Sequence, residues 1–381
     1  MKKTILYLAV LTAVFASCGK EPNVGDEAKK DEQFQEIAEN FLDKTVYPTY
    51  AALADKTEEL KEAMASLKAA PSQNALNNIC TIFLEARAEW ELSEAFLFGA
   101  ATDFGIDPHI DSWPLDEDSF NDLMSSPNIL KNLEGDEGAE YAGAKLGNEL
   151  LGFHGIEYIL FKEGKSRSIS EITSDMLTYA VAVSGDLRNR TAQLDVAWRG
   201  DAAPKTRRDL VEELELSTTV GGGDFSYGEN LLKAGEAGSL FYSKTHAMQC
   251  ILQACSTIVD EVGTSKIGKA HNGEDVSYIE SPYSYNSIVD FYDNIVSVAN
   301  VYYGGREGSR NKEKSLSAWF MENDASIASA MDDAIENALS KIKGMKAPFV
   351  LNFTDKSAEE AINACSKLDE VISRGVTSLA Q

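Results

Sequence analysis

The stretch LNNICTIFLEARAEWELSEAFLFG, residues 76–99, carries its apolar side chains at the three- and four-residue spacing of an α-helix. One face of the predicted helix holds Leu76, Ile79, Phe83 and Trp90. The same spacing recurs at residues 34–67, 139–161, 170–198, 227–262, 283–303, 312–342 and 354–379. No convincing run of residues alternates as a half-buried strand would, so the sequence predicts an all-α fold.

The chain has 381 residues, which is more than a single hydrophobic core usually serves. Long helices joined by irregular loops most simply pack as bundles, so two helical-bundle domains are expected. An aromatic-rich segment followed by a tryptophan occurs twice, at residues 96–113 and 301–319, which hints at duplication. Glycines and Pro204 interrupt the pattern in between, and we place an N-terminal bundle at residues 31–210 and a C-terminal bundle at residues 211–381.

The excess of acidic residues argues against some classes of binding partner. The chain has 61 acidic and 35 basic residues, which gives a formal net charge of -26. Such an excess repels phosphate backbones and anionic lipid surfaces, so nucleic acid is not an expected partner. It favours cations, although an acidic surface often serves only solubility.

The first residues have the pattern of a bacterial lipoprotein signal. Lys2 and Lys3 precede an apolar stretch, residues 4–16, that is too short to span a bilayer. Small residues then lead to Cys18. We therefore predict a signal peptide at residues 1–17, acylation of Cys18, a flexible tether at residues 18–30, and a lipid-anchored location in the cell envelope. Ordinary cleavage followed by secretion is the alternative.

The sharpest chemical feature is Gly152-Phe153-His154-Gly155-Ile156-Glu157. Residues three apart on a helix lie on one face, so His154 and Glu157 can converge and form half of a metal site. A buried hydrogen-bonded couple is the alternative. The chain has only 4 histidines, so any further ligands would be mostly carboxylates or water. No His-Glu-x-x-His signature of zinc proteases is present.

Several blocks of sequence together resemble the imelysin-like family. The blocks are Arg87–Gly99 with Ile110–Pro114, then Gly152–Tyr158, which matches a G-x-H-x-x-E motif, then Glu280–Ser284 with Asp290 and Asn294, and finally Val301–Gly304. They occur in order from about residue 35 to the C-terminus. Any one block is weak evidence, but the ordered set is similar to the family over nearly the whole mature chain.

The resemblance implies two helical bundles with a pocket between them, an envelope setting, and a link to bacterial iron uptake. It implies His154 and Glu157 as metal-site residues. The candidate pocket residues that it adds are Trp90, Ser93, Glu94, Gly152, Glu280 and Ser281. Core packing or helix capping is an equally good interpretation of several of these residues.

Three functions follow from the resemblance and the residues. The leading hypothesis is a non-catalytic or weakly catalytic lipoprotein that binds iron, or a small iron-bearing ligand, at the pocket between the bundles and works with an iron-uptake partner in the outer membrane. Zinc is the alternative metal. The second hypothesis is a metallopeptidase, which needs a third ligand and a general base. The third is a module that binds an organic ligand or a receptor, with a purely structural His154–Glu157 pair.

Overall fold

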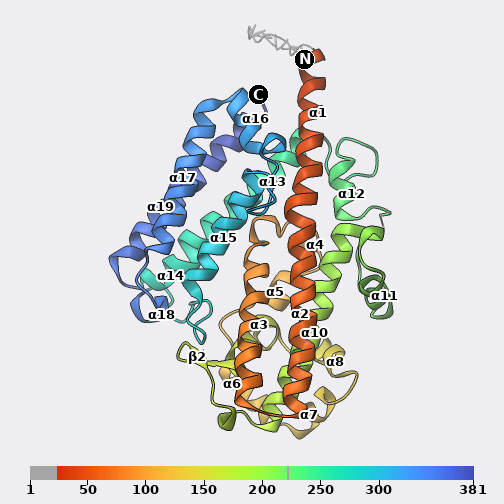
Figure 1. Cartoon of the computed structure of the whole chain (residues 1–381), viewed down its shortest axis with the longest axis vertical. Coiled ribbons are helices and arrows are strands. Elements are labelled where there is room, and N and C mark those ends of the chain that lie inside the picture. Colours follow the sequence, from red (N-terminus) through yellow and green to blue (C-terminus); the bar gives the residue numbers. More distant parts are fainter. Residues whose placement is uncertain (1–23, 221–222) are drawn as a thin grey trace, which may run out of the picture.

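The computed structural model describes residues 24–220 and 223–381, and within these ranges it is mostly helical (Figure 1). The prediction of an all-α fold is confirmed. The described residues form strands only in a two-residue hairpin, in which β1 (Phe161–Lys162) pairs antiparallel with β2 (Lys165–Ser166). The predicted signal peptide and the acylated Cys18 lie outside the described residues.

The described part of the chain begins with one long rod. It consists of α1 (Val24–Phe41), a π-helical turn (Leu42–Val46) and α2 (Tyr47–Ala69). This wider turn comes just before Pro48. In a regular α-helix the ring of a proline would clash with the carbonyl group four residues before it. The rod already begins at Val24, so the tether predicted for residues 18–30 is wrong from residue 24 onward.

Two long helices pack against the second half of this rod and form a layer with it. In this layer α2 packs against α3 (Gln73–Glu91) and α10 (Ser174–Arg199). The Ser72 side chain accepts a hydrogen bond from the amide of Ala75 at 3.3 Å and so caps the first turn of α3. The helix ends at Glu91, ahead of the glycine at position 99, and a 3₁₀ turn (Glu94–Phe96) follows.

Short helices connect α3 to α10. They are α4 (Ala100–Asp103), α5 (Ile106–Ile110), α6 (Glu117–Met124), α7 (Pro127–Leu133), α8 (Gly138–Lys145) and α9 (Gly152–Leu160). The single helix predicted at residues 139–161 is therefore wrong. A 3₁₀ turn (Asn148–Leu150) separates α8 from α9, and Gly152 has a φ of 63°, which breaks the helix.

The second half of the chain contains α11 (Lys205–Glu213), α12 (Tyr227–Leu232), α13 (Lys244–Glu261), a π-helical turn (Val262–Ile267), α14 (Gly268–His271), α15 (Ser287–Tyr302), α16 (Leu316–Asn323), α17 (Ala325–Lys343), α18 (Phe349–Asn352) and α19 (Lys356–Ser378). The helices predicted at residues 227–262 and 312–342 are each divided in two. At the second break the carboxylate of Asp324 accepts a hydrogen bond from the amide of Ile327 at 3.2 Å and begins α17.

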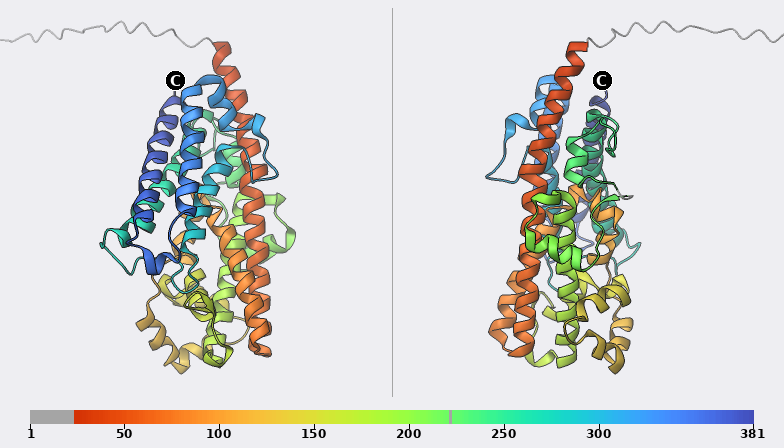
Figure 2. Two further views of the ribbon diagram at one scale, coloured as in Figure 1. Left: turned by 60° about the vertical axis from the view of Figure 1, so that its left-hand side comes forward. Right: turned by 90° about the vertical axis from the view of Figure 1, so that its right-hand side faces the viewer.

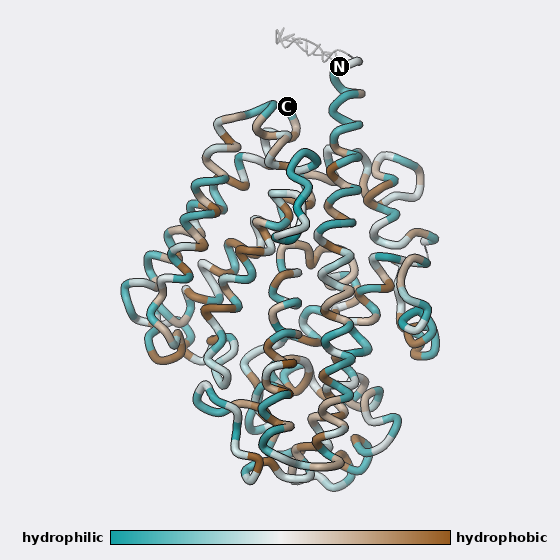
Figure 3. Tube along the Cα trace, viewed as in Figure 1, coloured by the Kyte–Doolittle hydropathy of each residue, from teal (hydrophilic) through white to brown (hydrophobic). Residues whose placement is uncertain are grey.

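The two halves lie side by side and share a core. Helices α13, α15, α17 and α19 occupy one side of the molecule, and α2, α3 and α10 the other (Figures 1 and 2). Buried apolar residues from Phe34 to Leu379 form one continuous cluster. Hydrophobic and hydrophilic residues alternate along the long helices, as expected of helices with one buried face (Figure 3). The division into domains at residue 210 stays a prediction.

Within the described ranges, none of the helices combines the length and the apolarity that a membrane span requires.

Candidate metal centre

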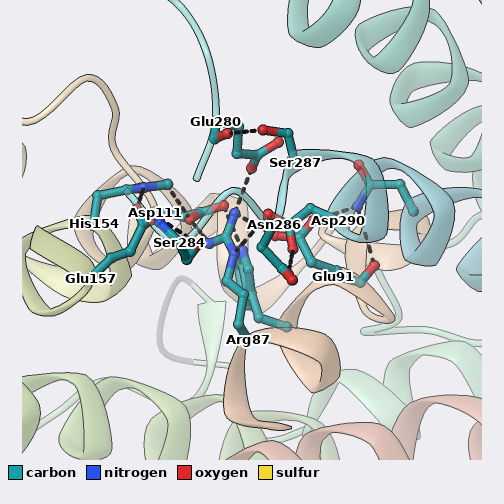
Figure 4. Close-up of polar contacts among 12 residues, drawn as sticks. Arg87, Glu91, Asp111, His154, Glu157, Glu280, Ser284, Asn286, Ser287 and Asp290 are labelled. Atoms are coloured by element: carbon teal, nitrogen blue, oxygen red, sulfur yellow. Dashed lines mark hydrogen bonds and ion pairs between the residues drawn. The ribbon is translucent and has the colours of Figure 1, made fainter. Parts of the chain in front are cut away.

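A buried cluster of charged side chains lies where α3, α9, α15 and the loop before α15 meet (Figure 4). Its central cation is Arg87, which is fully buried on α3. The guanidinium contacts four carboxylates: Glu91 on the same helix, Asp111 just after α5, Glu280 in the loop at 2.5 Å, and Asp290 on α15 at 3.9 Å. Segments far apart in the sequence therefore meet around one positive charge.

Asp111 is held in place from two sides. Its Oδ2 accepts a hydrogen bond from the indole Nε1 of Trp90 at 2.7 Å, and its Oδ1 accepts one from Arg87. Burial alone would raise the pKa of Asp111, but the charge of Arg87 and the contact with His154 outweigh that effect and hold the pKa below its usual range. Asp111 is therefore a carboxylate at neutral pH.

His154 is buried and lies between two carboxylates. Its Nε2 is 3.1 Å from Asp111 Oδ1, and its Nδ1 is 3.4 Å from Glu157 Oε2. Burial opposes protonation of the ring, but the contacts with these two carboxylates dominate and raise the pKa of His154 to about 9. The structure thus brings His154 and Glu157 together, facing inward, while the two ring nitrogens face different partners.

The second oxygen of Glu157 is occupied by the loop before α15. Its Oε1 accepts hydrogen bonds from the backbone amides of Tyr283 and Ser284, at 3.1 and 2.8 Å, and from the Ser284 hydroxyl at 2.7 Å. Glu157 therefore ties α9 to this loop and faces the Nδ1 side of His154. A carboxylate in that place fixes the orientation of an imidazole whose other nitrogen is available to a metal.

Three side chains in the cluster can offer ligand atoms to one ion. Asp111, His154 and Glu280 each place one such atom within 4.8 Å of the others. Glu280 Oε2 is buried and makes no hydrogen bond within the described part of the chain, whereas His154 Nε2, also buried, lies 3.1 Å from Asp111 Oδ1. Buried polar atoms without partners are rare and call for an explanation. One nitrogen and two oxygen donors suit a divalent ion such as iron or zinc.

A second buried cation is Lys266, in the π-helical turn after α13. Its Nζ is 3.1 Å from Glu280 Oε1, 3.4 Å from Glu94 Oε1 and 3.8 Å from Glu91 Oε2. Burial raises the pKa of both Glu91 and Glu94. Burial therefore favours the protonated, neutral form of these two carboxyl groups, although the charges of Arg87 and Lys266 act against it.

A cavity of about 190 Å³ reaches the cluster from the surface. Glu94, Asp107 and Asp111 line it from the first half of the chain, and Glu261 and Tyr278 from the second half. Burial, together with the charge of Asp111, raises the pKa of Asp107 to about 7. Four carboxyl side chains therefore line the cavity, and Asp111 is one of them.

The remaining candidate residues play different parts. Trp90 bonds Asp111 as described. Ser93 is buried and donates from Oγ to the Trp90 carbonyl at 2.7 Å, so its side chain serves the end of α3. Ser281 is buried next to Glu280 and has a φ of 47°. Gly152 offers no ligand, but a Cβ there would lie 1.8 Å from the Ile110 carbonyl oxygen, so only glycine lets α9 approach α5 this closely.

The other three histidines lie outside the cluster. His109 Nε2 is 2.7 Å from Asp186 Oδ2, and His246 Nε2 is 3.4 Å from Cys250 Sγ. The Nδ1 of His271 is 2.8 Å from the Phe353 carbonyl oxygen. Carboxylates therefore supply the donors that stand beside His154.

Sequence reasoning did not nominate Arg87, Asp111 or Lys266 as site residues. Arg87 and Asp111 lie inside the blocks that resemble the family, and a charged residue on the apolar face of a helix was an available signal. Lys266 lies in no motif.

Comparison with known proteins places this chain in a family. The sequence model described as Imelysin, peptidase M75, matches residues 46–374. The chain belongs to the imelysin family. It is 24% identical over 347 residues to iron-regulated protein A of Synechococcus elongatus, a match that covers 90% of this chain and 86% of that protein.

Two solved structures share the fold of this imelysin. The first is a candidate iron-regulated protein A precursor from Parabacteroides distasonis, with a TM-score of 0.77, 28% identity, and coverage of 95% of this chain and 97% of that one. The second is an imelysin-like protein from Psychrobacter arcticum, with a TM-score of 0.62, 14% identity, and coverage of 92% and 96%. The second likeness shows the fold alone.

Proposed function

We propose that this imelysin binds an iron ion, free or as part of a small iron-bearing ligand, through His154, Asp111 and Glu280. The observation that carries the proposal is the meeting of three buried side chains, Asp111, His154 and Glu280, which each place one ligand atom within 4.8 Å of the others, while Glu280 Oε2 makes no hydrogen bond within the described residues. Glu157 then acts on the opposite ring nitrogen and orients the imidazole.

Charge and shape support a cation. Carboxylates outnumber the basic side chains in the cluster, and a divalent ion would replace part of the missing positive charge. The cavity lined by Asp111 and three other carboxyl side chains favours a cation over an anion. Iron is favoured over zinc because relatives of this chain are named for regulation by iron.

We further propose that the protein works in bacterial iron uptake, held in the cell envelope by acyl chains on Cys18 and serving an outer-membrane partner. The lipoprotein pattern that ends at Cys18 supports the anchor. Labelling of cells with a radioactive fatty acid, for the wild type and Cys18→Ser, tests it. Equal incorporation of label into both proteins would overturn it.

The deciding experiment for the site measures bound metal. The purified protein is exposed to Fe²⁺ without oxygen, or to Zn²⁺, passed through a desalting column and analysed by mass spectrometry of the elements. We expect the wild type to retain iron, His154→Ala to lose it, and Glu157→Gln to retain it more weakly. His271→Ala is the matched control, because this histidine lies outside the cluster.

Each other outcome has a clear meaning. Equal metal content in the wild type and His154→Ala would remove the proposed site. Chelator-sensitive cleavage of a peptide library by the wild type, absent in His154→Ala, would favour the metallopeptidase. Binding of an organic ligand that His154→Ala leaves unchanged, with no metal retained by any variant, would favour the ligand- or receptor-binding module.

A further inference from the structure

We infer that a small cavity in the first half of the chain is a binding site for a free amino acid with an apolar side chain. The cavity lies where α8 and the end of α11 pack against α10 (Figure 1). None of the residues that line it belongs to the candidate metal centre. The inference therefore goes beyond the proposed function and does not depend on it.

The size of the cavity limits the ligand. Its volume is about 220 Å³. Cavities that hold drug-sized molecules have volumes of roughly 300–1,000 Å³. A ligand at this place is therefore a small molecule of few atoms, such as a single amino acid.

An unpaired acceptor lies at the cavity. Asn189 on α10 is only 6% exposed and is one of the lining residues. Its Oδ1 is buried and makes no hydrogen bond within the described ranges. A buried amide oxygen without a donor is costly. A ligand that donates a hydrogen bond, as an ammonium group does, would satisfy this atom.

An unpaired donor lies next to this acceptor. Arg190 also lines the cavity, and its Nε is buried and makes no hydrogen bond in the part of the chain that the structure describes. The Nε is 3.7 Å from Asp186 Oδ1, and Nη1 donates to Gln193 Oε1 at 3.3 Å. The guanidinium therefore keeps a donor for a further acceptor, and a carboxylate is the strongest partner for it.

The charges around the cavity also require a ligand with both signs. Arg190 supplies a positive charge, and the carboxyl groups of Glu140 and Asp186 line the cavity as well. Asp186 is buried, and His109 Nε2 holds its Oδ2 at 2.7 Å. Arg190 repels a simple cation, and the two carboxyl groups repel a simple anion. A molecule that carries one ammonium and one carboxylate group avoids both penalties.

The remaining wall is apolar. Leu214 and Leu216, which follow α11, are half-buried and line the cavity. On the opposite side, a Cβ at Gly143 would lie 2.1 Å from Asp186 Oδ1, so a glycine is needed where α8 passes this carboxyl group. An apolar side chain on the ligand would pack against the two leucines. An α-amino acid such as leucine combines all three features.

The test measures binding of L-leucine to the purified protein by isothermal titration calorimetry at pH 7. Two analogues divide the ligand into its parts, since 4-methylpentanoate lacks the ammonium group and 3-methylbutylamine lacks the carboxylate. We expect the wild type to bind leucine, and to bind each analogue about tenfold more weakly or worse, because each analogue leaves one buried protein group unpaired.

Two substitutions test the residues. Arg190→Met and Asn189→Leu should each weaken leucine binding by about tenfold or more. Asn189→Leu should also leave the unfolding temperature of the ligand-free protein unchanged or raise it, because it replaces an unpaired buried amide with an apolar side chain. Arg188→Met is the matched control, since Arg188 is on the same helix but does not line the cavity, and it should bind leucine as the wild type does.

Several results would overturn the inference. The first is that the wild type binds none of leucine, isoleucine, valine and methionine at millimolar concentration. The second is equal affinity for leucine and for either analogue, which would show that the site does not require both charges. The third is unchanged leucine binding in both Arg190→Met and Asn189→Leu, which would place leucine elsewhere. None of these results bears on the metal that His154 is proposed to bind.

Discussion

His154 Nε2 lies 3.1 Å from Asp111 Oδ1, although the two residues belong to α9 and to the segment that follows α5. Gly152 makes this approach possible, because it sits two residues before His154 at the point where α9 meets the carbonyl of Ile110, the neighbour of Asp111. The glycine of the motif therefore sets the position of the histidine and binds nothing itself.

Gly152→Ala should destabilise the protein by about 3 kcal/mol or more, because the added Cβ meets the Ile110 carbonyl and the φ of 63° is unfavourable for alanine. Metal retention should fall with it as α9 moves away. Thermal unfolding and metal content measure the two effects.

The control for this substitution is Gly105→Ala. Gly105 has a similar φ of 61°, but a Cβ there has nothing within 4 Å. The free energy of unfolding of Gly105→Ala should fall by only about 1 kcal/mol, the cost of a positive φ at a residue other than glycine, and the variant should keep its metal. A loss as large as that of Gly152→Ala would show that the clash with Ile110 is not what matters.

Trp90→Phe should weaken metal binding and cost about 1–3 kcal/mol of stability, since it leaves the Oδ2 of Asp111 without the indole donor at 2.7 Å. Trp198→Phe is a matched comparison, because Trp198 is also buried and its Nε1 makes no hydrogen bond within the described ranges. Chemical denaturation and metal titration of both variants test this. Equal losses of metal affinity would contradict an orienting role for Trp90.

The sequence predicts the long helices but not their breaks. Apolar spacing depends on neighbours a turn away, and it gave α10, α15 and α19 to within a few residues. The break at Gly152 depends on Ile110, a contact between distant segments that no local pattern records. The start of the rod at Val24 was missed because residues 24–30 are polar and show no apolar spacing. They are helical because they continue the helix that the buried apolar residues after them stabilise.

In the site, too, local contacts could be predicted from the sequence and contacts between distant segments could not. His154 and Glu157 are one helical turn apart, so their proximity could be predicted from spacing. Glu280 was selected only through the family resemblance. Lys266 reaches the cluster through the π-helical turn of residues 262–267, and apolar spacing gives no sign of such a turn.

Arg87→Met should destabilise the metal-free protein by about 3–5 kcal/mol, because it leaves Glu280, Asp111 and their neighbours buried without their central counter-charge. Arg306→Met is the comparison, since Arg306 pairs with Glu89 at 2.7 and 2.8 Å but remains a quarter exposed. It should cost about 1 kcal/mol or less.

Saturating Mn²⁺ should raise the unfolding temperature of Arg87→Met more than that of the wild type, because the ion replaces part of the lost positive charge. Unfolding temperatures with and without Mn²⁺ measure the difference. An identical rise in both proteins would count against a cation site beside Arg87.

A half-buried carboxylate outside the cluster predicts how stability depends on pH. Burial, followed by the charges of Asp290 and Glu89, raises the pKa of Asp293 on α15 from 3.8 to about 7. The folded state therefore holds this proton more tightly than the unfolded state does. Its contribution to stability is fully present below about pH 4 and is lost as the pH rises through about 7.

Asp293→Asn removes the ionisation while keeping the shape of the protonated acid. The unfolding temperature of the variant should therefore match the wild type near pH 4 and exceed it above pH 7, by a free energy on the order of 1–3 kcal/mol. Metal-free protein is used, so that the comparison does not depend on the site. Asp31→Asn, at an exposed position on α1, should follow the wild type across the range. If the difference between Asp293→Asn and the wild type stayed constant from pH 4 to pH 8, Asp293 would not be the group that loses its proton.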